Sequence, residues 1–315
     1  MSVAPSFAYQ TLADTGFFTL KKQLETHPYS DRAWYQKHQW RRHGLFAHYS
    51  PQYPLWSDGA EKKRWIYIPR KRRIDTRDME AWVFPVGTKI WKEFAFSVAG
   101  ETTRLETRLM EKTGENDWLM ITFVWNDAQT QALRAPAEGI KNHYALTADT
   151  YYDIPSEHDC QYCHAKAGLD IGPQSTPVLG FSALQLSGER DPDAIHGEAW
   201  HKGMLNLPRL DALRITTHPA QYQPKIPDSE IAPLQRQVFG YLHGNCGHCH
   251  NETGMGALTN TLDLSHRASA TFIQQNGVYR SAIGKNITYY LAPPNSPARY
   301  IAPGDADDSA IIYRM

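Results

Sequence analysis

All four cysteines of the chain stand in two copies of one pattern, a Cys-x-x-Cys pair followed directly by histidine. The first motif is Cys160–His164, with the sequence CQYCH, and the second motif is Cys246–His250, with the sequence CGHCH. Since only 14 of the 315 residues are histidine, chance alone would place histidine after both pairs roughly 0.2% of the time. One chemical explanation should therefore account for both motifs.

Covalent attachment of haem c explains each position of the pattern. The two thiols add across the vinyl groups of the haem, and a two-residue spacer on a helical turn sets the sulfurs at the required separation. The next residue then turns its imidazole toward the iron as the proximal ligand. The sequence thus predicts two covalently bound haem c groups, held by Cys160, Cys163 and His164 and by Cys246, Cys249 and His250.

Three other uses of the Cys-x-x-Cys spacing compete with this interpretation. Four cysteines in two pairs could form a structural zinc site, but such a site gives no reason for histidine after both pairs. A thioredoxin-like redox pair would need a βαβ context and would occur once. Cysteines two residues apart rarely close a structural disulfide on each other. Haem attachment is the favoured explanation.

Charge and hydropathy exclude several functions. Lys plus Arg and Asp plus Glu each number 33, so no global charge favours nucleic acid or an anionic membrane surface. No apolar run approaches the roughly 18–20 residues that span a bilayer. The sequence contains no nucleophile triad, phosphate loop or zincin pattern, and no catalytic residue is predicted.

The first residues, MSVAP, have neither a basic n-region nor an apolar h-region, and so do not form a signal peptide. Haem c attachment occurs outside the cytoplasm, so we expect a periplasmic or extracellular protein whose export signal is missing from the given sequence.

Strand patterns dominate the chain between Arg64 and Asn126. Runs rich in β-branched and aromatic residues, several of them alternating, are separated by turn-forming residues. We predict strands at 65–68, 81–84, 103–109 and 119–125, with the last two in a β-hairpin. The segment from about 50 to 150 would be an antiparallel sheet.

After Asp153 the composition changes to proline, glycine, asparagine and short helix-like pieces. Short helices and loops wrapped around haem suit this composition, because the macrocycle replaces much of a hydrophobic core. The expected fold class is α+β, with an N-terminal antiparallel β domain followed by two small, mostly α-helical, cytochrome c-like haem lobes. The expected division is a mixed or helical segment at 1–49, the β-rich domain at 50–152, and haem lobes at 153–235 and 236–315.

Several further stretches accompany the two motifs: YPLWSDGAEK at 53–62, FPVGTKIWKEF at 84–94, TFVWN at 122–126, IPS at 154–156, VLGFSALQLS at 178–187, YLHGN at 241–245 and PGD at 303–305. Together they resemble a largely uncharacterised family of bacterial dihaem c-type cytochromes with a β-rich N-terminal domain. Lobes of that family usually place a distal methionine in a Met-Pro segment after the Pro-Gly-Asp stretch, whereas this chain stops at Met315. Either the sequence is truncated or the second haem has another sixth ligand.

The sixth ligands decide between a carrier and an enzyme, because a closed iron transfers electrons and an open one permits peroxide chemistry. For the first haem the candidates are His196, His201, Met204 and His218, and the resemblance favours His196 as the distal ligand. For the second haem the candidates are Met255, His266, Met315, His243 and His248.

The favoured function is an exported dihaem cytochrome that transfers electrons between redox protein partners, a carrier more than a catalyst. The alternatives are a dihaem peroxidase-like enzyme with one open haem site and a haem subunit of a larger oxidoreductase assembly. The sequence leaves the oligomeric state open.

Three segments outside the motifs have competing interpretations. The basic residues and histidines between Lys21 and His48 form a solvated helix, a docking patch for an acidic redox partner, or a source of an axial histidine. The polar loop 56–61 is either a turn built by Asp58 and Gly59 or a ligand site. The aspartates at 305–308 either bind a cation or cap a helix at 310–315.

Overall fold

The computed structural model of the chain describes residues 9–26, 44–98, 100–164, 178–230, 232–252, 262–287 and 297–314. The strands are β1 Leu45–Tyr49, β2 Glu61–Ile68, β3 Lys89–Val98, β4 Glu101–Lys112, β5 Trp118–Trp125, β6 Ala132–Arg134, β7 Ile140–Ala145, β8 Tyr151–Ile154 and β9 Met204–Leu205. The α-helices are α1 Phe17–Thr26, α4 Glu157–His164, α5 Leu207–Ala212, α6 Gln235–Asn245 and α7 Gly277–Ser281, and the 3-10 turns are Leu12–Thr15, Ile273–Gln275 and Ile312–Arg314.

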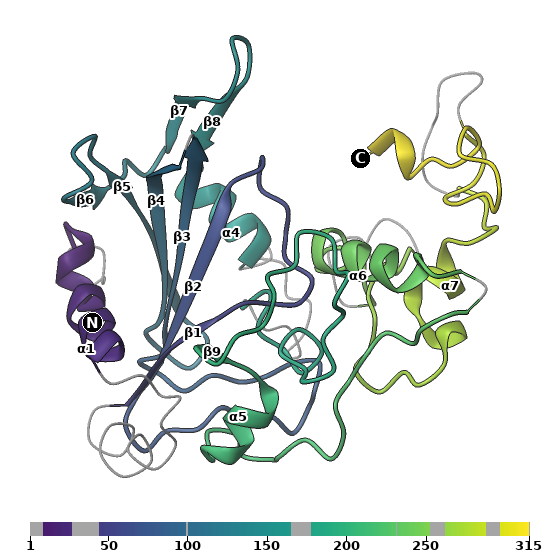
Figure 1. The fold of residues 1–315 in the computed structure, drawn as a ribbon, viewed down its shortest axis with the longest axis horizontal. Helices are drawn as coiled ribbons and strands as arrows, with labels where there is room; N and C mark the ends of the chain where they lie inside the picture. Colours follow the sequence, from purple (N-terminus) through teal and green to yellow (C-terminus); the bar gives the residue numbers. More distant parts are fainter. Residues whose placement is uncertain are drawn as a thin grey trace.

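A seven-stranded sheet organises the described chain (Figure 1), with the strand order β6-β5-β4-β3-β2-β1-β9. Neighbours from β1 to β6 are antiparallel, and β9 runs parallel to β1. The predicted hairpin is confirmed, because β4 pairs with β5 and the Thr113 N–H closes the turn on the Asp117 carbonyl at 2.9 Å. The predicted strand at 81–84 is wrong, since Val83 forms only an isolated bridge with Asp75.

The two faces of the sheet carry different layers. Helix α1 covers one face, where Phe17 packs within 5.5 Å of the Trp91 ring and joins a core of aromatic residues from β1 to β5. On the opposite face, Ile66, Ile68 and Ile90 pack against Phe181 and further apolar residues from 178–215. The segment after the first motif therefore completes the core of the sheet.

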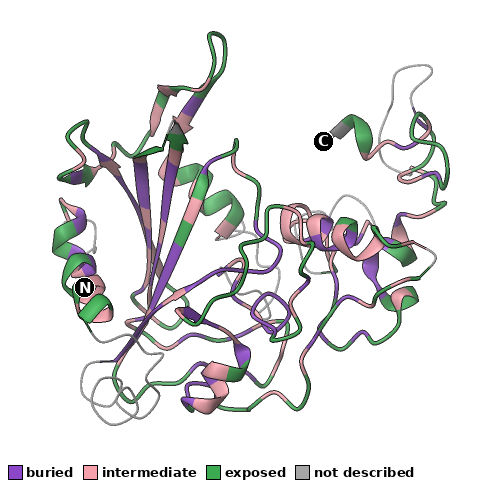
Figure 2. Cartoon of the chain, viewed as in Figure 1, coloured by how far each residue is buried: buried purple, intermediate pink, exposed green. Residues whose placement is uncertain are grey.

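The expected fold class is wrong for this reason. The described chain is mostly β and 19% helical, with five short α-helices, and its described residues do not form two helical cytochrome lobes. Proline, glycine and asparagine serve extended loops between 178 and 215 instead, because this segment buries its apolar side chains on an existing sheet. Apolar residues after 225 form a separate cluster around α6 and α7. Figure 2 shows the buried stretches along the central strands and in the loops near β9.

Two of the smaller interpretations can be compared with local geometry. Asp58 and Gly59 have positive φ angles of 49° and 78°, and the Ala60 N–H bonds the Ser57 carbonyl at 2.8 Å, so the turn is confirmed. The helix expected at 310–315 is wrong, because only a 3-10 turn forms at 312–314.

Most of the basic segment between Lys21 and His48 lies outside the described residues. No helix in the described parts of the chain combines the length and apolar character that crossing a bilayer requires.

Candidate haem cavity

The first motif lies on α4, whose start is defined by a reciprocal cap. The Asp159 N–H donates to the Ser156 hydroxyl at 3.1 Å, and the Ser156 N–H donates to the Asp159 carboxylate at 3.0 Å. Cys160 and Cys163 are thus one helical turn apart on the same side of α4, as haem attachment requires. The predicted helical spacer is confirmed for this motif.

The second motif follows directly from α6. Cys246 is the C-cap residue of that helix, and the His250 N–H bonds the Cys246 carbonyl at 2.9 Å, so the helical turn continues through the motif. The side chain of Asn245 accepts the Trp56 N–H at 2.7 Å and donates to the Tyr241 carbonyl at 2.9 Å. The loop 54–57 therefore anchors the second motif to the sheet.

A close backbone approach reinforces this anchor. A Cβ atom added at Gly240 or at Gly244 would fall less than 3.0 Å from Tyr53, on the ring in the first case and on the backbone oxygen in the second. Glycine at these positions lets α6 rest directly on Tyr53, which is itself buried among residues from 184–191, α6 and α7.

Both motifs reach one cavity of about 930 Å³ between the sheet, α4 and the segment 243–269. That volume lies at the upper end of the roughly 300–1,000 Å³ of small-molecule and cofactor sites. Its wall includes Cys160, Cys163 and His164 from the first motif, and the nearby His243 and His266. The second motif contributes only its spacer residues Gly247 and His248, and Cys246, Cys249 and His250 are not part of the described wall. The sequence does not predict that the two motifs face a common space.

Burial lowers the pKa of four histidines on or beside the cavity wall. Burial, assisted by His266 and His248, lowers the pKa of His243 to about 3, and burial lowers the pKa of His266 to about 4. Burial also lowers the pKa of His248 and of His250. Neutral imidazole is the form that ligates a metal ion, so these residues fit a role as axial ligands.

The structure separates the predicted distal ligands into two groups. His243, His248 and His266 line the cavity, and His266 is only 1% exposed. Four other candidates are absent from the described cavity wall. His196 is exposed and lies beside Tyr241, and Met204 lies in β9. His201 stacks on His48, and His218 lies beside Asp75. Met255 and Met315 lie outside the described residues.

The other uses of the cysteines fit less well. The four cysteines form no disulfide with one another, and within the described residues they do not converge as a group of metal ligands. A thioredoxin-like βαβ unit is absent around α4, because the strands before it form the antiparallel β7–β8 ribbon.

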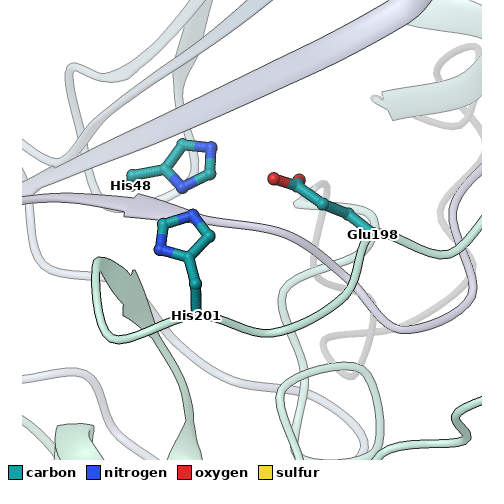
Figure 3. Close-up of side chains that lie close together, drawn as sticks. All are labelled: His48, Glu198 and His201. Atoms are coloured by element: carbon teal, nitrogen blue, oxygen red, sulfur yellow. The ribbon is translucent and has the colours of Figure 1, made fainter.

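The described residues contain one cluster with metal-ligand spacing, formed by His48, Glu198 and His201 (Figure 3). The two imidazole rings stack with centroids 5.8 Å apart. The Gly203 N–H donates to Nδ1 of His201 at 2.9 Å, so that nitrogen already accepts a hydrogen bond from the backbone.

His48 in this cluster makes stability depend on pH. Burial, together with His201, Arg64 and Lys63, lowers its pKa from 6.5 to about 4. The unfolded chain takes up the proton near pH 6.5 and the folded chain only near pH 4, so acidification over that interval favours unfolding by at most about 3 kcal/mol.

We expect His48→Gln to lose less stability between pH 7 and 4.5 than the parent protein in urea unfolding. The matched control is His158→Gln on the exposed face of α4, and equal pH slopes for all three proteins would contradict the prediction.

Comparisons of the chain with models of protein families, with curated proteins and with solved structures find no match.

Proposed function

We propose that the chain is a dihaem c-type cytochrome that transfers electrons between redox protein partners, as its resemblance to the bacterial dihaem cytochromes implies. The observation that carries the proposal is the cavity reached by both motifs. Cys160, Cys163 and His164 open onto this cavity, and the second motif reaches its wall through Gly247 and His248, so haem groups held by the two motifs would be near each other.

The residues around the cavity fit the group chemically. Cys160, Cys163 and His164 would hold one haem, and Cys246, Cys249 and His250 the other. When bound, haem iron supplies reversible one-electron oxidation and reduction. The sheet and the end of α6 form part of the cavity wall, and the side chains of β2, β3 and β4 set the charge around it.

Carrier chemistry is favoured over peroxidase chemistry by the neutral histidines on the cavity wall. His243, His248 and His266 lie where they could fill sixth positions, and a filled position closes the iron to peroxide. Attachment of haem c outside the cytoplasm places the proposed carrier in the periplasm or the extracellular space.

The test is made on the full chain, produced in a host that exports it and attaches haem c. The mass after denaturation should exceed that of the polypeptide by roughly 1.2 kDa, the mass of two haems. Optical and EPR spectra should show two low-spin haems that are reduced reversibly and do not turn over peroxide. Absence of covalent haem would contradict the proposal, and a high-spin haem with peroxide-dependent turnover would replace the carrier with the peroxidase-like enzyme.

A further inference from the structure

Three cations stand side by side across the sheet. The strand register places Arg64 of β2 opposite Lys92 of β3, and Lys92 opposite Arg108 of β4. Adjacent strands are about 4.8 Å apart, so the three side chains share one face in a continuous row. Like charges in directly opposed positions destabilise a sheet, so the row requires an anion to balance it.

Only one of the three cations has a carboxylate partner. Arg108 forms an ion pair with Glu106 at 2.5 Å, and the side chain of Glu106 is fully buried. Arg64 is 6% exposed, and Lys92 contacts the Phe94 ring with its Nζ atom 4.6 Å from the ring centroid. Within the described residues neither Arg64 nor Lys92 forms an ion pair with a carboxylate.

The surroundings of Lys92 confirm that positive charge is in excess. Burial lowers the pKa of Lys92 well below its usual value, and Arg64, Arg108 and Lys62 lower it further while Glu106 opposes them. Burial also lowers the pKa of Arg64, against weak support from Tyr49 and Glu198. A buried charge without a partner is costly, and such groups normally pair or bind a ligand.

The row of cations forms part of the cavity wall and lies near residues of both motifs. Arg64, Lys92 and Arg108 all line the cavity. Arg108 lies close enough to Cys160 to interact with it, and Lys92 interacts with both Cys163 and His248. Helix α4 contacts β5, so the row leads away from the first motif in the order Arg108, Lys92, Arg64.

An apolar row lies beside the cations. Ile90, Met110 and Met120 are paired across β3, β4 and β5, two residues along the strands from the cation row, and all three line the cavity. This face of the sheet therefore offers a flat apolar surface next to a line of positive charge. A haem has the same division, with an apolar macrocycle and two carboxylates.

We propose that Lys92 and Arg64 bind the propionate carboxylates of the haem attached through the first motif. The propionates leave the macrocycle at the edge opposite the vinyl groups that the thioethers use. The thioether edge would lie near Cys160 and Arg108, and the propionate edge would lie one to two strands farther across the sheet. This inference rests on the proposed function, because it takes the haem as given.

The test measures the midpoint potentials of the two haems in Lys92→Met and Arg64→Met, in a buffer free of carboxylates and phosphate. Haem content is first counted by mass in each variant. A buried cation beside a propionate stabilises the reduced haem, so each substitution should lower the potential of one haem. Redox-difference infrared spectra should show a shifted carboxylate band. Lys63→Met is the matched control. It removes the same charge, but Lys63 is exposed on the opposite face of β2.

The outcomes separate the present inference from the proposed function. A chain without covalent haem overturns both. Two haems with unchanged potentials and carboxylate bands in Lys92→Met and Arg64→Met overturn the propionate assignment alone, as would an equal shift in Lys63→Met. If added succinate shifts the potential of the parent protein but not of Lys92→Met, the cations bind a free carboxylate instead, and the assignment to propionates falls.

Discussion

Replacing Cys160 and Cys163 together with serine is expected to remove one covalent haem, roughly 0.6 kDa of mass, and to change the midpoint potential of the other. The loss of mass follows from the need for both thiols in thioether attachment. The change in potential follows from the shared cavity, because a haem lost from α4 would admit water next to the second motif and alter the charge that this motif faces.

The reciprocal variant, Cys246→Ser with Cys249→Ser, is the matched control for the first, since it makes the same chemical change at the second motif. Each variant should keep one haem after denaturation, as measured by mass spectrometry, and redox titration then gives its potential. Retention of both haems in either variant would contradict attachment at the motifs. Potentials identical to those of the parent protein would show that the two haem sites are independent and do not share a cavity.

A single methyl group at Gly240 is expected to destabilise the protein by at least about 2 kcal/mol, within the range for overpacked cores. Alanine normally stabilises an exposed helical position relative to glycine by up to about 1 kcal/mol, so the direction of the effect is diagnostic. Here the added Cβ meets the Tyr53 ring at less than 3.0 Å, and α6 would have to move away from the sheet. The second motif would move with it.

The measurement is the free energy of unfolding in urea for Gly240→Ala, with Val238→Ala as the control on the exposed side of the same helix. The combination of Gly240→Ala with Tyr53→Leu should cost less than the sum of the single changes, because the smaller side chain removes the obstruction. Additive costs, or a stabilised Gly240→Ala variant, would show that α6 does not rest on Tyr53 in solution.

The parts of the fold that local patterns predict are those with runs of strand-forming residues. The hairpin of β4 and β5 and the strand β2 follow from runs rich in β-branched and aromatic residues bounded by turn signals, and the structure confirms them. Strand β3 was missed because Lys92 and Glu93 interrupt its apolar residues and a bulge at Phe94 and Ala95 changes its register. Such interruptions have tertiary causes, which local sequence patterns do not contain.

The helical lobes were wrongly predicted because composition does not show what a segment packs against. Loops rich in proline and glycine after residue 153 were expected to surround haem, whereas Phe181, Leu186 and Leu205 complete the core of a sheet made by the other half of the chain. The candidate site shows the same limit. The two motifs are evident from their spacing, but the common cavity and the row formed by Arg64, Lys92 and Arg108 depend on strand register and long-range packing.

The short strand β9 makes the two halves of the chain interdependent. It pairs with His48 and Tyr49 and so shields part of an edge of the sheet that would otherwise present unpaired N–H and C=O groups. A fragment ending after β8 would lose this shield together with the apolar cover of Phe181 and Leu205. The expected consequence is aggregation of the isolated sheet, so the two halves of this chain should fold and unfold as one unit.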